Sequence, residues 1–241
     1  MNIPHEATRY GSAQHHRGPH LGALAMVYTV LFLAGLYPVI TFTGGAHFPG
    51  PWESGDAIAS YFQAHPTPVL ICAFLQFGAA VPLGIYTAAI VSRLRFLGIR
   101  AAGPYIALFG GLATVFDMMA CAHVLWVMVR PGIAQDTVVL RALYYLSFSL
   151  GGPGFSVPMG LLMAGVSVSV GFRKLLPKWV VGFGLLLAAC GELSWISMIV
   201  PNAVFLIPLT RFPGFIWLIA AGFMLPATVT SRVGQPGIAE G

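Results

Sequence analysis

Charged residues are scarce in this sequence. Asp, Glu, Lys and Arg make up 8% of the 241 residues, whereas hydrophobic residues make up 57%. Soluble domains carry about 25% charged residues, so this composition excludes an ordinary soluble domain, and we expect lipid to be the main surrounding medium. The net charge of +5 does not indicate nucleic acid as a partner, because the basic residues do not cluster on one solvated face.

Cysteines and catalytic motifs are also few. The three cysteines, Cys72, Cys121 and Cys190, are dispersed in apolar runs, so we expect small packing residues rather than a disulfide framework. The motifs Gly-x-Ser-x-Gly and His-Glu-x-x-His are missing, and residues 151–154 lack the Lys and Ser or Thr of a phosphate loop. The sequence therefore assigns no catalytic residue, no metal ligand and no cofactor, and an enzyme is disfavoured.

What the sequence does contain is six long apolar runs, close to or above the roughly 20 residues that a membrane-spanning helix needs. They cover residues 21–43, 68–92, 104–129, 140–171, 179–200 and 212–229. The connections between them are mostly too short to fold on their own. The sequence thus predicts an all-α fold, with one six-helix membrane domain over residues 21–229 in contact with membrane lipids.

The basic residues are distributed unevenly between the two sides of this domain. Nine lie at the two termini and in the second and fourth connections: Arg9, Arg17, Arg93, Arg95, Arg100, Arg173, Lys174, Lys178 and Arg232. Three lie on the other side: Arg130, Arg141 and Arg211. This bias predicts that both termini are cytoplasmic, and it favours the inner membrane of a bacterial cell. Residues 1–20 would form a flexible cytoplasmic tail and residues 230–241 a second one, with run 21–43 retained rather than cleaved as a signal peptide.

The longest outer connection, residues 44–67, has the pattern of a short helix. Ser54 is a typical N-cap residue, and Asp56 places a negative charge at the helix N-terminus. Apolar residues follow at helical spacing, which predicts an amphipathic helix near residues 55–65 on the outer membrane surface. Trp52, Tyr61 and Phe62 would then lie at the level of the lipid headgroups.

The fourth run is rich in residues that break helices. It contains Gly151, Gly152, Pro153, Gly154 and Pro158 near its middle. Proline removes a backbone donor and clashes with the preceding turn, and glycine adds conformational freedom. This pattern predicts a fourth helix that is kinked or broken at membrane depth, where protein or water must cover the irregular backbone. Pro82 indicates a milder irregularity in the second run.

Short stretches of the chain repeat at a similar offset. Residues 81–84 (VPLG) are similar to residues 157–160 (VPMG), and Asp117 and Glu192 are related by an offset of 75 residues. This pattern suggests that the second and third runs duplicate the fourth and fifth, as in transporters built from parallel repeats. Because the match is short and uses residues that are common in membranes, chance similarity stays open as an alternative.

Asp117 and Glu192 each lie in a long apolar run without a neighbouring charge. If their helices begin near Gly103 and Lys178, both lie 14 residues into the membrane, or about 21 Å. A carboxylate near the bilayer centre costs about 2.5–3.5 kcal/mol unless it is paired, protonated or hydrated. Small neighbours predict that both face the bundle interior, where they would share a proton or bind a cation. The alternative is that each merely fixes the register of its helix.

Other polar residues are expected to complete or flank this site. Gln76 would lend an amide, and Ser156 a hydroxyl, to the carboxylates. His123 would extend a polar path outward or, alternatively, bond a backbone carbonyl in a structural role. Because His123 is the only histidine inside a run, haem held by two histidines of one chain is disfavoured. The histidines at positions 15, 16 and 20 are interpreted as part of the tail.

Two stretches carry a resemblance to known proteins: residues 54–62 (SGDAIASYF) and residues 211–218 (RFPGFIWL). On these stretches and on its layout, the chain resembles a broad group of small bacterial six-span membrane proteins of unknown function. The resemblance implies a fold but no catalytic residue. Arg211 itself is expected to mark the outer end of the sixth helix, bonded to loop carbonyls or to Asp136.

These features predict an integral membrane protein with a polar carboxylate site inside the membrane. The leading hypothesis is transport of a proton, a cation or a small solute. One alternative is a non-catalytic membrane subunit or scaffold, in a homo-oligomer or with a partner in a membrane complex. A second alternative is a membrane-embedded redox or lipid-modifying enzyme that uses His123 with a carboxylate.

Overall fold

The computed structural model describes residues 13–230, and this part of the chain is almost entirely helical. Six helical segments in it are long and apolar enough to cross a membrane, which confirms the predicted all-α six-span integral membrane protein. The first three are α1 (Leu21–Thr41), α3 (Pro66–Phe96) and α4 (Gly103–Met128). The fourth consists of α5 (Thr137–Ser149), a π-helical turn η1 (Leu150–Gly154) and α6 (Phe155–Arg173); the last two are α7 (Lys178–Leu193) with η2 (Ser194–Met198), and η3 (Pro201–Phe205) with α8 (Leu206–Met224).

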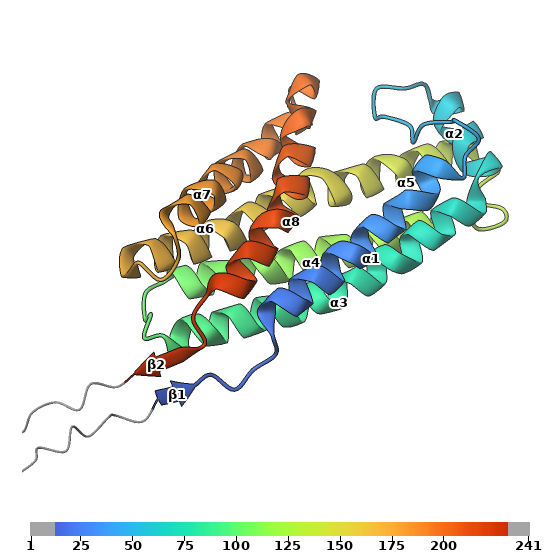
Figure 1. Cartoon of the computed structure of the whole chain (residues 1–241). Helices are drawn as coiled ribbons and strands as arrows, with labels where there is room; N and C mark the ends of the chain where they lie inside the picture. Colours follow the sequence, from blue (N-terminus) through green and yellow to red (C-terminus); the bar gives the residue numbers. More distant parts are fainter. Residues whose placement is uncertain (1–12, 231–241) are drawn as a thin grey trace, which may run out of the picture.

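The α6 helix lies at the centre of the bundle, between α4 and α7, and α1 packs between α3 and α8 (Figure 1). Glycines allow the close approach of these helices. A Cβ atom on Gly165 of α6 would lie 2.5 Å from the carbonyl oxygen of Gly103, and one on Gly191 of α7 would lie 2.7 Å from the carbonyl oxygen of Ser156. Small residues at such interfaces let membrane helices pack backbone to backbone, and these two glycines let α4 and α7 approach α6 closely.

The short helix α2 (Gly55–Ala64) begins as predicted, with the Ser54 hydroxyl accepting a hydrogen bond from the backbone N–H of Ala57 at 3.2 Å. Its apolar face, however, packs on the protein rather than on lipid. Ile58 and Phe62 are fully buried against a cluster that includes Leu140. Tyr61 and Phe62 are therefore covered by protein, because the ends of α3, α4 and α5 offer α2 an apolar surface of their own, and their predicted depth at the lipid headgroups stays a prediction.

The end of the bundle that carries α2 is predicted to face outward, and we call it the outer end. The two described chain ends meet at the opposite end (Figure 1), where β1 (Ala13–His15) pairs antiparallel with β2 (Thr228–Thr230). The His16 ring bonds the Ser92 hydroxyl at 3.0 Å, and the His20 side chain caps α1. Residues 13–20 thus differ from the predicted flexible tail, whereas residues 1–12 and 231–241 lie outside the described part.

The fourth span is broken where the sequence predicted a break. Between α5 and α6, the η1 turn contains Gly152 with φ −93° and ψ −105°, which is outside the helical region. Pro158, in contrast, lies inside the regular helix α6, and Pro82 lies inside the continuous helix α3. The irregularity is therefore confined to residues 150–154, where two adjacent glycines precede a proline.

Candidate functional site

The two intramembrane carboxylates contact the same helical segment at different levels. A Cβ atom on Gly154 would lie 3.3 Å from Oδ2 of Asp117, and one on Gly160 would lie 3.2 Å from Oε1 of Glu192. Six residues of an α-helix correspond to about 9 Å along its axis. Within the described residues, no hydrogen bond or ion pair joins Asp117 to Glu192, so the structure brings each to the fourth span but not to the other.

Asp117 lines a groove on the surface of the bundle, next to the break. The groove has a volume of about 370 Å³ and is bordered by Ser149, Pro153 and Trp195. Glu192 does not line it; instead, its Oε1 atom is buried without a hydrogen-bond partner among the described residues. The two carboxylates therefore do not form one site in this conformation.

The sequence prediction missed the polar group that does reach the centre of the bundle, which is Arg211. The α8 helix buries Ile207, Gly214 and Leu218 on one face, and Arg211 lies on the same face at the intervening helical spacing. Its Nη2 atom donates a hydrogen bond to the carbonyl oxygen of Gly151. Its guanidinium lies over the ring of Phe155, 4.5 Å from the centroid, a distance that allows a cation–π interaction.

Arg211 binds the fourth span at the point where the backbone of that span cannot form all of its own hydrogen bonds. In a regular α-helix the N–H of Phe155 would bond the carbonyl of Gly151, but here it bonds that of Gly152, and Pro153 has no N–H to donate. A carbonyl freed in this way at membrane depth needs a donor from elsewhere in the protein, and Arg211 supplies one to Gly151. The break therefore exposes a backbone acceptor, and the partly buried Arg211 donates a hydrogen bond to it.

The expected position of Arg211 at the outer end of the sixth helix is therefore wrong. The helical segment begins at Pro201, so Arg211 lies inside it. Pro208 is accommodated in the first turn of α8, where the backbone N–H groups have no partner within the helix. Asp136 is not bonded to Arg211; its carboxylate accepts hydrogen bonds from the N–H groups of Val138 and Val139 and caps α5.

Arg211 lines two adjoining cavities. The inner one, of about 240 Å³, lies among α1, α3, α4 and α8, and the outer one, of about 620 Å³, lies beneath the loop of residues 47–53. Both are lined by Leu36, Phe48, Cys121, Leu125, Gly151 and Arg211. Because they share these residues, the two cavities adjoin each other, and we call the pair the path, which extends from the outer loop to Arg211.

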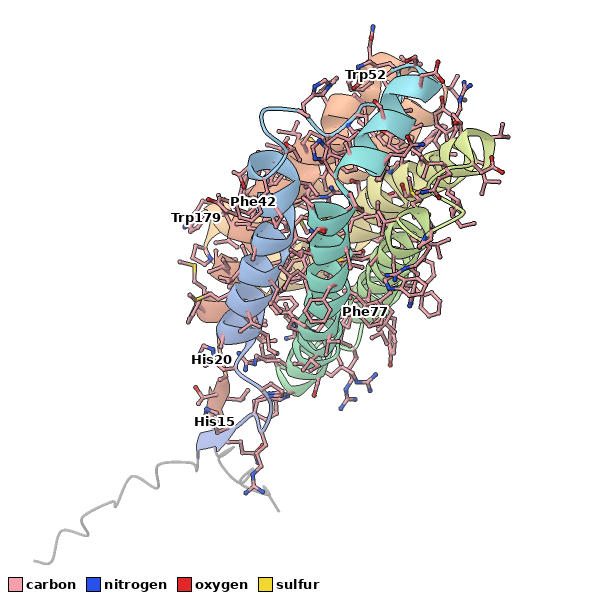
Figure 2. The ribbon with its side chains drawn as sticks, turned by 90° about the vertical axis from the view of Figure 1, so that its right-hand side faces the viewer. His15, His20, Phe42, Trp52, Phe77 and Trp179 are labelled. Carbon is pink, nitrogen blue, oxygen red and sulfur yellow. The ribbon has the colours of Figure 1, made fainter. Side chains whose placement is uncertain are left out.

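The predicted site residues are distributed over different places. Gln76 lies in the inner cavity, where its Nε2 atom donates to the carbonyl of Phe32 at 3.1 Å, so it is near Arg211 rather than beside Asp117. Ser156 is fully buried where α6 packs on α7, and its hydroxyl has no hydrogen-bond partner in the described part. His123 is exposed on the lipid-facing side, with its ring 4.9 Å from that of Phe77. Figure 2 shows Phe77 on that outer surface.

The outer cavity is lined by one carboxylate, that of Glu53, which is already hydrogen-bonded. Glu53 accepts a hydrogen bond from the backbone N–H of Gly50 at 2.5 Å and lies 2.9 Å from Nε2 of His47. The Gly50 N–H and, to a smaller extent, the His47 ring lower the pKa of Glu53 below its ordinary value. Trp52 lies beside this pair at the end of the molecule opposite His15 (Figure 2).

The site around Arg211 carries a positive charge that no carboxylate of the described residues neutralises. Among the described residues, no carboxylate forms an ion pair with Arg211, and no group of three or more His, Cys, Asp or Glu side chains is placed to hold a metal ion. The path from the outer end therefore leads to a positive charge, with apolar walls around it. No family model, curated protein or solved structure matches the chain, so the site is interpreted from its geometry alone.

Proposed function

We propose that this protein binds a small solute from the outer side of the membrane and moves it toward the cytoplasm. The observation that carries the proposal is the path of adjoining cavities that leads from the outer loop to Arg211 at the broken fourth span. Cavities of a few hundred Å³ with few polar groups are typical of small-molecule sites. In transporters such sites lie near the bilayer midplane and are built from discontinuous helices.

The broken span provides the conformational element that transport requires. A ligand that bonds the free donors of Arg211 is linked through the same guanidinium to the carbonyl of Gly151. A shift of the guanidinium toward the ligand would weaken its bond to the η1 turn, whose glycines allow the backbone to change conformation. Ligand binding would in this way be coupled to the angle between α5 and α6, and so to which side of the bundle is open.

The proposal also includes the two intramembrane carboxylates, because both contact the fourth span. Asp117 contacts η1 at Gly154, and Glu192 contacts α6 at Gly160. Intramembrane carboxyl groups are common carriers of protons or cations in transporters. We propose that Asp117 and Glu192 exchange a proton or cation when the fourth span moves, in the inner membrane of a bacterial cell with both termini cytoplasmic.

The test is uptake of radiolabelled solutes into proteoliposomes, measured with carboxylates, amino acids, sugars and sodium ions, each with and without a pH gradient. We expect uptake of at least one class of solute, and we expect Asp117→Asn or Glu192→Gln to abolish its dependence on the gradient while leaving the fold intact. Asp136→Asn is the matched control, because asparagine also caps helices and Asp136 lies outside the cavities. If both variants keep the full dependence on the pH gradient, the carboxylates have no role in coupling. If no solute is transported, the proposed transport function is wrong.

A further inference from the structure

We infer that the ligand of these cavities is an anion with an apolar body, for example a carboxylate attached to a ring or a short chain, and that its charged group binds Arg211. The inference rests on the proposed function for the idea that the cavities receive a solute. It adds the chemical class of that solute, which the geometry around Arg211 determines.

The donors of Arg211 are incompletely used. A guanidinium offers five N–H donors, and in the described part of the chain Arg211 forms one hydrogen bond, to Gly151. Its Nε atom is buried without a hydrogen-bond partner among these residues. Arginine presents its N–H groups as a planar fork that matches the two oxygens of a carboxylate. The free donors and the uncompensated charge both favour an anion.

The rest of the lining excludes a cation and favours an apolar body. The inner cavity contains no carboxylate among the described residues that line it. In the outer cavity Glu53 is already bonded to Gly50 and His47. Leu36, Leu125 and Phe155 surround the Arg211 end, so a fully hydrated anion such as inorganic phosphate would lose its water without replacement.

Binding is to be measured by equilibrium dialysis against the full chain in nanodiscs of zwitterionic lipid. The probes share one apolar body: phenylacetate, the neutral phenylacetamide and the cationic phenylethylamine, with inorganic phosphate as an anion that lacks the ring. We expect phenylacetate to bind at least about tenfold more tightly than the other three, as one charge-assisted hydrogen-bonded pair provides. Equal binding of phenylacetate and phenylacetamide by the wild-type chain would overturn the inference without any variant.

Four variants test whether Arg211 is the binding residue. Arg211→Gln should reduce phenylacetate binding to the level of phenylacetamide, and Arg211→Lys should retain part of the difference. Leu36→Trp should weaken binding of the ring compounds by filling the shared wall of the cavities. Arg141→Gln, which removes an exposed arginine of the outer surface that lines neither cavity, should leave all affinities unchanged. A loss of the preference for phenylacetate in Arg141→Gln as large as in Arg211→Gln would contradict the assignment.

The anionic group could belong to a soluble molecule or to a lipid, and repeating the dialysis with phosphatidylglycerol in the nanodiscs distinguishes them. Weaker phenylacetate binding would identify an anionic lipid as a competitor for Arg211, and unchanged binding would identify a soluble anion. Failure of the inference and of the proposed function can also be told apart. Arg211-dependent phenylacetate binding without uptake of any solute would support the anion site and contradict transport, whereas uptake of other solutes without a preference for anions would support transport and contradict the anion site.

Discussion

At the scale of single residues, the chain places one arginine where the surrounding helices offer it almost no counter-charge. Its position on the buried face of α8 follows a spacing that is visible in the sequence, since Ile207, Arg211, Gly214 and Leu218 are separated by four, three and four residues. Its partner could not be predicted, because Gly151 is 60 residues away in the chain. The pairing of Asp117 with Glu192 was expected from equal depth, but depth carries no information on which face of α6 each helix covers.

The Glu53 carboxylate allows a prediction about pH. Its pKa is held below the ordinary value of 4.5, mainly by the Gly50 N–H. A lowered folded pKa means that the stabilising contribution is present above the unfolded value and is lost as the pH falls through the folded one. We expect the fluorescence of Trp52 to change in a transition below pH 4.5, and Glu53→Gln, which keeps an acceptor for Gly50, to abolish that transition. The same transition in the variant would show that another group is responsible.

At the scale of elements, the prediction succeeded where the determining signal is local. Two glycines followed by Pro153 weaken the fourth helix through their own backbone, and Ser54 starts α2 within its own turn. The surface that α2 covers is not local information, because it is formed by α3, α4 and α5 together. The start of α8 was predicted too late for a related reason, since Pro208 is tolerated in the first turn of the helix and Pro213 lies inside it without ending it.

The packing of α4 on α6 can be tested through its glycines. We expect Gly165→Leu to destabilise the bundle by about 1–3 kcal/mol or more, the range for overpacked interiors, because a Cβ atom there would lie 2.5 Å from the Gly103 carbonyl. Gly182→Leu is the matched control, since nothing lies within 4 Å of its Cβ position. Thermal unfolding in detergent, followed by circular dichroism, measures both. A Gly165→Leu variant as stable as the control would mean that α4 and α6 are not held at this distance.

At the scale of the whole molecule, six spans and their order follow from composition, whereas the path into the bundle does not. The path exists because α2 and the loop of residues 47–53 cover the outer end without filling it, and because the fourth span bends at η1. Each of these depends on contacts between segments that are distant in the chain. The apolar surface that remains outside, with Phe74 and Phe116 about three quarters exposed, suits a lipid environment.

The native cysteines can report whether this path opens to the outer side. Cys121 lines both cavities, and Cys190 on α7 lines neither. In variants that lack Cys72, which also lines the inner cavity, and keep only one of the other two, we expect a membrane-impermeant thiol reagent added outside to modify Cys121 at least about tenfold faster than Cys190, because access controls the reactivity of thiols. Adding Leu36→Trp should slow the reaction of Cys121. Modification of Cys121 only from the cytoplasmic side would reverse the orientation.

The strand pair near the chain ends has a consequence for biogenesis. Residues 13–15 are synthesised before the six spans, and their partners, residues 228–230, are synthesised after them. Arg93 bridges the same two regions, with its guanidinium 3.5 Å from the carbonyl oxygens of Pro19 and Leu225. The first strand therefore has no partner until the last of the six helices has been made, so formation of this ribbon requires that all six spans are already present.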